Sequence, residues 1–303
     1  MLQGSPSTFR LGAIGVDTSH LPEFTKRIKA MNEAGATRCR VTRLWTDGQH
    51  GMRAEQAQKW QQSAVEMGVK PASSMEELLG DVDGVMVLSV NGHTHLRFAT
   101  PALQRGLPTY IDKPLTCSLA EARQLLALAR QHEARCYSAS SLRFAAEVTE
   151  LPRDELGPLH AIDAFGPGEL SPSMEGLFFY GVHAIEMVDA IWGPGVRRVS
   201  AITMPDRDLL DLEYHDGRYA RLRMERKGCY EFGAAVHGQK KVHQLRVDFA
   251  DVYNRLIRGM TRFFEGGEAP TKLRDLVENV AVMEAGNESM KRDGAWIEVP
   301  RIE

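Results

Sequence analysis

The sequence contains no apolar stretch near the roughly 20 residues that a membrane-spanning helix needs, and its first ten residues lack the apolar core of a signal peptide. It has no basic run, and 37 Lys and Arg against 40 Asp and Glu argue against nucleic acid as the main ligand. Its four cysteines, Cys39, Cys117, Cys136 and Cys229, show no Cys-x-x-Cys spacing, so neither a zinc site nor a disulfide framework is expected. We therefore expect a cytoplasmic globular protein with reduced thiols that handles a small molecule.

Apolar residues make up 43% of the sequence, which is enough for a substantial core. A length of 303 residues is typical of about two domains. Up to about residue 143, short apolar runs alternate with segments of helical periodicity, which predicts βαβ units and a doubly wound parallel sheet. The predicted strands span residues 9–16, 40–45, 84–90, 109–111 and 135–140. Helices are predicted between them, at 52–67 and 94–104 among others, and Ser-x-x-Glu sequences at 73–76 and 118–121 indicate capped helix starts.

From about residue 144 the pattern changes to runs in which apolar and polar residues alternate. A helix at 180–192 precedes five such runs, at 196–203, 209–214, 218–224, 231–237 and 242–247. Alternation gives each strand one covered and one open face, so we predict an antiparallel sheet, with a hairpin turn at Asp216-Gly217. Helices at 251–265 and 272–291 complete the chain. The predicted architecture is a Rossmann-type α/β domain, 1–143, followed by an α+β domain with a large antiparallel sheet, 144–303.

Several segments, in order and spacing, resemble the Gfo/Idh/MocA family, the group of glucose-fructose oxidoreductase and inositol dehydrogenase. Residues 90–95 and then 111–115 (IDKPL) resemble the family's strand end with its Glu-Lys-Pro segment, with aspartate in place of glutamate. Residues 137–144 (YSASSLRF) resemble the strand that leaves the first domain ahead of an arginine. Residues 181–186 (GVHAIE) resemble the family's Gly-x-His-x-x-Asp helix start.

The resemblance implies an NAD(P)-dependent oxidoreductase acting on a sugar, cyclitol or similar polyol, with Lys113 and His183 beside the reacting carbon. Oxidation of an alcohol removes a hydride from carbon and a proton from oxygen, so a base must contact the hydroxyl, and histidine titrates in a suitable range. We expect the Lys113 ammonium to polarise the same oxygen, in a cleft between the domains. Tyr180 and Arg143 are further candidate substrate contacts, although Arg143 is equally able to pair with a carboxylate. Glu186, one turn after His183, either orients its ring or is a solvated helix residue.

The predicted phosphate-binding turn departs from the family's Gly-x-Gly-x-x-Gly pattern, because it reads Gly15-Val-Asp17-Thr-Ser-His20. An Asp17 carboxylate beside a pyrophosphate, at about 4 Å and an effective dielectric near 20, would cost roughly 4 kcal/mol. Either cofactor binding is lost, or Asp17 turns inward to cap the following helix while Thr18 and Ser19 offer hydroxyls to the phosphates. We favour inward capping, and a cationic His20 would also offset the charge.

The other candidate cofactor contacts follow the strand ends, where sheets of this type bind ligands. They are Asp47, Ser89, Asn91, His95, Asp112, Lys113 and Pro114. Asp47 is placed to accept hydrogen bonds from the adenosine ribose, which favours NAD over NADP. Arg43 and Arg53 would instead hold a 2′-phosphate. Of His93 and His95, one is expected to line the cleft and the other to be solvated.

The helix start also departs from the family, since Phe179 stands where an aspartate is common four residues before the histidine. A third carboxylate for a proton relay is therefore missing. Three functions follow: an oxidoreductase acting through Lys113 and His183, a non-catalytic sugar-binding or regulatory protein that has lost the cofactor, and a lyase or hydrolase that forms a transient 3-keto sugar with tightly held NAD. The resemblance also implies a homodimer or homotetramer assembled through the open face of the second sheet.

Overall fold

The computed structural model describes residues 7–48 and 54–303, and the chain divides into two compact units. Unit 1 consists of Met1–Asp112, Gln124–Ser138 and Ile257–Lys272, and unit 2 of Lys113–Arg123, Ala139–Leu256 and Leu273–Glu303. The late segment belongs to unit 1 because the Glu265 carboxylate accepts hydrogen bonds from the Thr37 hydroxyl, at 2.9 Å, and from the Arg38 amide, at 2.5 Å. The units therefore interleave along the chain, whereas the sequence pattern predicts one boundary between residues 143 and 144.

Unit 1 contains a six-stranded parallel sheet of order β3-β2-β1-β4-β5-β6. Its strands are β1 (Phe9–Ile14), β2 (Cys39–Trp45), β3 (Lys70–Pro71), β4 (Gly84–Val87), β5 (Thr109–Ile111) and β6 (Cys136–Ser138). The predicted doubly wound sheet is confirmed; β3 was missed because two exposed residues carry no apolar pattern. The strand order reverses between β1 and β4, and such a switch point is where sheets of this class bind ligands.

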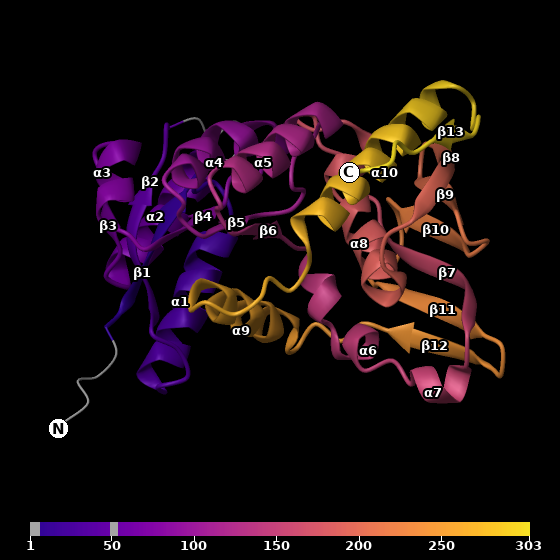
Figure 1. Cartoon of the computed structure of the whole chain (residues 1–303), viewed down its shortest axis with the longest axis horizontal. Helices are drawn as coiled ribbons and strands as arrows, with labels where there is room; N and C mark the ends of the chain where they lie inside the picture. Colours follow the sequence, from indigo (N-terminus) through magenta and orange to yellow (C-terminus); the bar gives the residue numbers. More distant parts are fainter. Residues whose placement is uncertain (1–6, 49–53) are drawn as a thin grey trace. The chain divides into compact units, whose positions relative to one another are not determined.

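The helices of unit 1 follow the predicted periodicity. They are α1 (His20–Glu33), α2 (Ala54–Glu66), α3 (Met75–Gly80) and α4 (His95–Gln104), while α5 (Leu119–Gln131) and α9 (Val252–Phe264) pass from one unit into the other. Figure 1 shows α1 and α4 on opposite faces of the sheet, as right-handed crossovers require. The start of the helix predicted at 52–67 lies outside the described residues. The cap of α3 is Ser74, whose hydroxyl accepts from the Glu77 amide, so the predicted Ser73–Glu76 box is wrong by one residue.

Unit 2 contains a seven-stranded sheet of order β12-β11-β7-β10-β9-β8-β13. Its strands are β7 (Leu159–Pro167), β8 (Val196–Met204), β9 (Arg207–Tyr214), β10 (Tyr219–Glu225), β11 (Gly233–Gly238), β12 (Val242–Arg246) and β13 (Ile297–Glu298). The predicted hairpin joins β9 to β10, and Gly217 in it has the positive φ (87°) that the turn requires. The sheet is mixed, because β7 pairs parallel to β10. The predicted large antiparallel sheet is confirmed for the other strand pairs. Strand β7 was not predicted, because its alternation of apolar and polar residues is weak.

Helix α8 (Gly181–Trp192) packs on β7 and β10, and α10 (Leu273–Lys291) packs on β8 and on α8 (Figure 1). Because α8 packs against both the sheet and α10, most of its residues are buried, which explains its mostly apolar sequence. A Cβ on Gly181 would lie 3.0 Å from Leu177 and 3.3 Å from the Met224 sulfur, so only glycine permits this close packing. The packing fixes the start of α8, two residues before His183.

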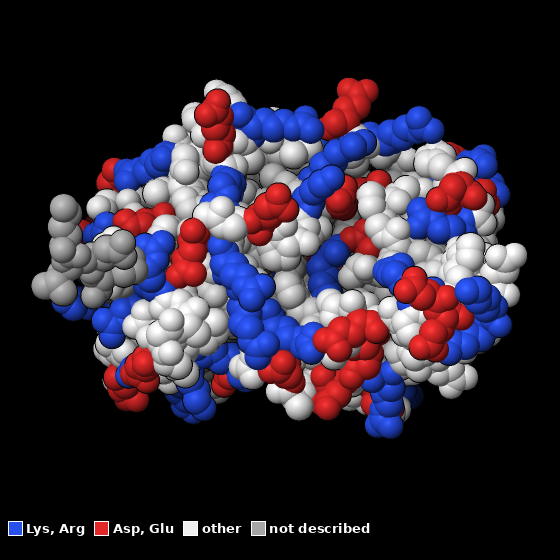
Figure 2. Space-filling view, turned by 60° about the horizontal axis from the view of Figure 1, so that its bottom comes forward, with Lys and Arg blue, Asp and Glu red and all other residues white. Residues whose placement is uncertain are grey.

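The remaining short elements of unit 2 connect these layers. They are η3 (Ser141–Phe144), α6 (Ala146–Thr149), α7 (Arg153–Leu156) and η4 (Gly176–Phe178). Over the described part of the chain, no helix is both long enough and apolar enough to cross a membrane. Basic and acidic side chains are interspersed over the face seen in Figure 2, as the near balance of charge leads one to expect.

Candidate functional site

In unit 2 the two predicted catalytic side chains lie on either side of one aromatic cluster. The Lys113 ammonium lies 5.9 Å from the centre of the Tyr180 ring and 5.7 Å from that of Phe179. The His183 ring lies edge-on to the same tyrosine, with 5.2 Å between ring centres. Lys113, Tyr180 and His183 are all partly exposed, so a ligand can reach them. The arrangement places a cation and an imidazole beside a single phenol.

The surroundings of His183 are aromatic where the family pattern has a carboxylate. Buried Phe232 packs against the imidazole at 5.8 Å between ring centres, and Phe179 packs against Tyr180 at 5.2 Å. The hydroxyl of Tyr180 hydrogen-bonds to that of Tyr230, which comes from the loop before β11 and is half exposed. Sequence reasoning missed Tyr230, because its loop is remote from every motif; the only signal was an aromatic pair, Tyr230 and Phe232, beside a strand.

Behind His183 lies a network of buried hydrogen bonds. The Ser140 hydroxyl is 2.7 Å from His183 Nδ1, and the Ser140 amide donates to Glu186 at 2.8 Å. Arg143 donates to Glu186 at 2.7 Å and also pairs with Asp189. Glu186 is 2% exposed and bonds to Ser140 and Arg143, so the predicted alternative of a solvated helix residue is wrong.

The position of Arg143 decides between its two predicted roles. Its side chain is only 10% exposed and lies between two buried carboxylates, Glu186 and Asp189. Asp189 also accepts a hydrogen bond of 3.3 Å from Asn279 on α10. Buried charges of this kind must be paired, and the pairing occupies the guanidinium. Arg143 is therefore a structural cation, the second of the two roles predicted for it.

In unit 1 the unusual aspartate of the predicted phosphate turn bonds to a neighbouring strand end. The amide of Val90, just after β4, donates to Asp17 Oδ1 at 3.0 Å. The N-cap of α1 is Ser19, with no side-chain capping bond, so the prediction that Asp17 caps this helix is wrong. Thr18 is buried, and its hydroxyl accepts from the His20 amide at 3.2 Å. Asp17 therefore ties the turn after β1 to the loop after β4.

Gly15 opens the turn in a conformation that suits only glycine. Its φ is +70°, and a Cβ there would lie 2.7 Å from the Ser89 Cβ. Gly15 thus allows β1 and the Ser89 loop to approach closely just before the amino end of α1. The amino end of a helix is in general a favourable place for phosphate oxygens.

His20, which stands at the position of the third glycine, pairs with a buried carboxylate. Its Nδ1 lies 2.5 Å from Asp112 Oδ2, and its ring stacks on Phe24 with 4.8 Å between centres. The Tyr110 hydroxyl donates to the other oxygen of Asp112 at 3.5 Å. Asp112 is only 3% exposed, and its carboxylate is the hydrogen-bond partner of the His20 ring. Because a carboxylate only accepts hydrogen bonds, the His20 proton lies on Nδ1.

The loop after β4 holds the next group of predicted cofactor contacts. Asn91 caps the short helix η2 (Gly92–Thr94) by accepting from the His93 amide at 3.1 Å. Ser89 shares a hydrogen bond of 2.5 Å with Thr94, and its carbonyl lies 2.8 Å from His95 Nε2. His95 has no exposed surface, so the prediction that it contacts the cofactor or lines a cleft is wrong; its ring holds the loop instead.

The end of β2 carries the residues predicted to select the cofactor. Asp47 pairs with Arg97 of α4 at 2.5 Å. Arg43 is engaged by Glu77 and, at 2.8 Å, by Asp81. Arg53 lies outside the described residues. Pro114 is buried, and the peptide bond that joins it to Lys113 is cis. Asp47 thus stands at the sheet edge with a cation beside it.

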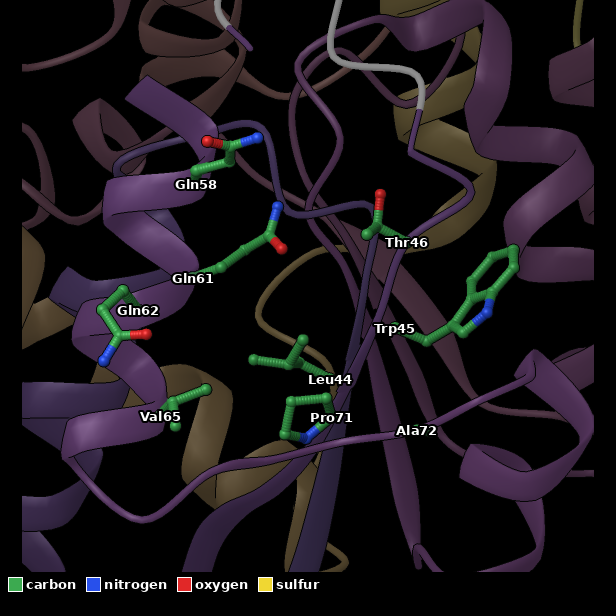
Figure 3. A pocket seen from close by; sticks show the side chains of 9 residues that line it. All are labelled: Leu44, Trp45, Thr46, Gln58, Gln61, Gln62, Val65, Pro71 and Ala72. Atoms are coloured by element: carbon green, nitrogen blue, oxygen red, sulfur yellow. The ribbon is translucent and has the colours of Figure 1, made fainter. Parts of the chain in front are cut away.

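A cavity of about 280 Å³ lies between the end of β2 and α2. It is lined by Leu44, Trp45, Thr46, Gln58, Gln61, Gln62, Val65, Pro71 and Ala72. Figure 3 shows the amides of Gln58 and Gln61 directed into the space opposite Thr46. Since amides donate and accept hydrogen bonds, an amide-lined space with an apolar floor suits a flat, neutral polar group. Thr46, which lines the cavity, directly precedes Asp47 in the sequence.

Burial decides the protonation of two further groups on β6. It raises the pKa of the Tyr137 phenol well above its usual value and that of the Cys136 thiol to about 12. Both groups are therefore uncharged at neutral pH, so neither supplies a base. Within residues 7–48 and 54–303, no cluster of three or more His, Cys, Asp or Glu side chains is arranged to hold a metal ion.

Comparison with known proteins shows what the first part of this chain is similar to. Residues 9–140 match the model of GFO_IDH_MocA, an oxidoreductase family with an NAD-binding Rossmann fold. Over 134 residues the chain is 28% identical to the uncharacterized oxidoreductase YhhX of Escherichia coli (strain K12), a stretch that covers 40% of this chain and 39% of that protein. Over residues 9–140 the chain is therefore similar to this family of oxidoreductases, the Gfo/Idh/MocA family that its motifs resemble.

Two solved structures share the fold over nearly the whole chain. One is GenD2 from gentamicin A biosynthesis in complex with NAD, 18% identical, with a TM-score of 0.79 and 99% of both chains covered. The other is apo scyllo-inositol dehydrogenase from Lactobacillus casei, 14% identical, with a TM-score of 0.79 and 97% of this chain and 99% of that one covered. Identities this low establish the common architecture alone, a parallel Rossmann sheet followed by a large, mostly antiparallel sheet.

The bond between Asp17 and Val90 leads to a first prediction. Asp17→Ala removes the only side-chain tie between the turn and the Val90 amide, so we expect unit 1 to lose about 1 kcal/mol of unfolding free energy. If the carboxylate also faces the phosphates, Asp17→Gly should bind NAD more tightly than wild type. A melting curve and a calorimetric NAD titration on both variants measure the two effects. Unchanged stability in both variants would contradict the bridging role, and Asp163→Ala, at an exposed carboxylate of unit 2, is the control.

Proposed function

We propose that this protein is an NAD(P)-dependent oxidoreductase that moves a hydride between the cofactor and the carbinol carbon of a sugar, cyclitol or related polyol. The observation that carries the proposal is that Lys113 and His183 lie beside one ring, that of Tyr180. The match of residues 9–140 to an oxidoreductase family supports the class of reaction. The substrate class is supported by the resemblance of residues 111–115 and 181–186 to the family and by one fold relative, an inositol dehydrogenase.

The turn at Gly15 and the amino end of α1 suit a dinucleotide, because the amino end of a helix is a favourable place for phosphate oxygens. Its proposed contacts are Thr18, Ser19 and His20 in the turn, Ser89, Asn91 and Asp112 beside it, and Asp47 at the ribose. The Val90 amide binds one oxygen of Asp17, which directs that oxygen towards the loop after β4. When bound, the nicotinamide accepts or returns the hydride.

The chain's own residues handle the proton and the orientation of the substrate. The Lys113 ammonium, near the rings of Phe179 and Tyr180, polarises the reacting oxygen. His183 takes the hydroxyl proton during oxidation and returns it during reduction. The hydroxyl of Tyr180 orients the substrate, and the rings of Phe179 and Phe232 limit access of water to the proton-transfer groups. With no carboxylate at position 179, the proton passes through His183 alone.

Binding measurements test the proposal and the choice of cofactor together. We expect NADH to bind more tightly than NADPH, because Asp47 accepts hydrogen bonds from ribose hydroxyls and repels a 2′-phosphate. Asp47→Ser should narrow the difference, since Arg97 then loses its carboxylate partner and can attract the phosphate. Calorimetry measures both affinities, and Asp211→Ser, at a carboxylate paired with Arg221 in unit 2, is the matched control. The proposal fails if neither nucleotide binds; the NAD preference fails if NADPH binds equally well.

We also propose that the protein assembles as a homodimer or homotetramer through the open face of the unit 2 sheet. That face exposes Phe165, Ile202 and Met204, each at least 40% accessible. Clustered apolar side chains on a broad sheet are typical of an interface with a second copy. Light scattering during size-exclusion chromatography should give twice or four times the mass of 33.8 kDa, whereas a single-chain mass would refute the assembly.

A further inference from the structure

Ser140 lies between β6 and η3, where it is held by helix α8 at two points. Its hydroxyl is 2.7 Å from Nδ1 of His183, and its backbone amide donates to Glu186 Oε2 at 2.8 Å. His183 and Glu186 are three residues apart and therefore lie on one face of α8. Ser140 is fully buried, and its own oxygen accepts a third hydrogen bond, of 3.2 Å, from the Leu142 amide. Three bonds thus determine the place of this hydroxyl.

We propose that Ser140 is the positioning residue of His183: its hydroxyl holds the imidazole by Nδ1 so that Nε2 carries the proton transfer. The proposal rests on the proposed function for the identity of the reaction, but the hydrogen bond and its effect on the ring do not depend on it. The motif comparison does not predict a partner for His183. The family commonly has an aspartate four residues before the histidine, and Phe179 stands at that position here.

A hydroxyl partner has a consequence that a carboxylate partner does not. A carboxylate only accepts, so it holds the imidazole proton on the nitrogen that faces it. A serine hydroxyl both donates and accepts, and its hydrogen rotates. When Nδ1–H donates to Ser140, Nε2 is a base and takes the proton of the substrate hydroxyl. When the serine O–H donates to Nδ1, Nε2 carries the proton and is a hydrogen-bond donor.

During oxidation one proton passes from the substrate hydroxyl to His183, and no other proton acceptor takes part. Neutral His183 begins with Nδ1–H donating to Ser140, and Nε2 receives the proton released by the substrate hydroxyl. The resulting imidazolium still donates from Nδ1 to the same oxygen, so the bond of 2.7 Å persists through the transfer. In reduction the same proton returns from Nε2 to the oxygen of the product. The pair therefore serves both directions without a change of partner.

The frame behind Ser140 explains why its place is stable. Glu186, which accepts from the Ser140 amide, is itself held by Arg143 at 2.7 Å, and Arg143 is held in turn by Asp189. The hydrogen bond from the backbone amide of residue 140 to Glu186 does not involve the side chain of residue 140. Ser140→Ala therefore removes the contact to His183 while it retains the backbone anchor, so the variant isolates the hydroxyl.

The experiment combines a spectroscopic readout without substrate and a kinetic readout with it. Imidazole ¹⁵N spectra of ¹⁵N-histidine protein, with His183 assigned through His183→Gln, report which ring nitrogen carries the proton. We expect Ser140→Ala to shift the His183 signals and their pH profile, and to lower kcat about 10- to 100-fold with KM within about threefold. Ser140→Thr, which retains the hydroxyl, should restore both readouts. Ser289→Ala, at another buried serine whose hydroxyl contacts the Ala295 carbonyl, is the matched control.

The outcomes separate this inference from the proposed function. Unchanged His183 signals in Ser140→Ala overturn the inference, whatever the activity. Signals that shift while kcat and its pH profile stay at the wild-type values also overturn it, because the contact would then not serve catalysis. If wild type oxidises no polyol with NAD, the proposed function fails, and the spectra alone then decide whether Ser140 sets the proton position of His183.

Discussion

Replacing either Lys113 or His183 by alanine should lower kcat by 10²- to 10⁴-fold, the usual effect of removing a positioned acid or base. Both side chains adjoin Tyr180, at 5.9 Å for the ammonium and 5.2 Å for the imidazole ring. Two groups that lie so close to one ring can act on one substrate oxygen. NAD affinity should change little, because we propose that the phosphates bind at Gly15 and the start of α1.

The double variant tests whether the two groups serve one step. If they do, the combined loss in kcat is well below the product of the single losses, because groups that act as a unit are not additive. Steady-state kinetics with NAD and a panel of polyols measures this, and calorimetry checks cofactor binding. Lys241→Ala, just before β12, and His243→Ala, on β12, are the matched controls. Full activity in either catalytic variant, or losses that multiply, would contradict a shared role.

The second large effect concerns stability and depends on Arg143. Arg143→Met leaves Glu186 and Asp189 as buried carboxylates without their cation, 2% and 6% exposed respectively. Breaking a buried pair in this way typically costs about 3–5 kcal/mol, because the uncompensated charge remains in a medium that solvates it poorly. Asp189 Oδ1 is buried and lacks a hydrogen-bond partner in the described structure, so few other groups stabilise the charge of this carboxylate.

Urea denaturation followed by circular dichroism measures the loss. Adding Glu186→Gln and Asp189→Asn to Arg143→Met should recover much of it, because the triple variant has no buried charge at this site. Arg221→Met is the matched control, since Arg221 pairs with Asp211 on an exposed strand face and such pairs contribute only about 0–1 kcal/mol. A single Arg143→Met variant as stable as that control would show that the network does not support unit 2.

The comparison of sequence and structure divides by the range of the interactions. Strands such as β4 and helices such as α8 were predicted within a few residues, because burial on one or both faces imposes a period that a short window records. Strand β7 was missed because small residues dilute that period, and its parallel pairing with β10 depends on a partner more than 50 residues away. A register of that kind has no local signal.

The candidate site divides in the same way. By itself the sequence determined that this is a parallel α/β domain followed by a sheet domain, and which residues, Lys113 and His183 among them, occupy the family's motif positions. Periodicity and motif order belong to the chain. Only the tertiary structure decided that Arg143 is a structural cation, that His95 is buried, that Asp17 bonds to Val90, and that Ser140 holds His183. Each of these facts depends on a partner that tertiary packing brings close. The sequence around a polar side chain does not indicate which distant group will form its hydrogen bond.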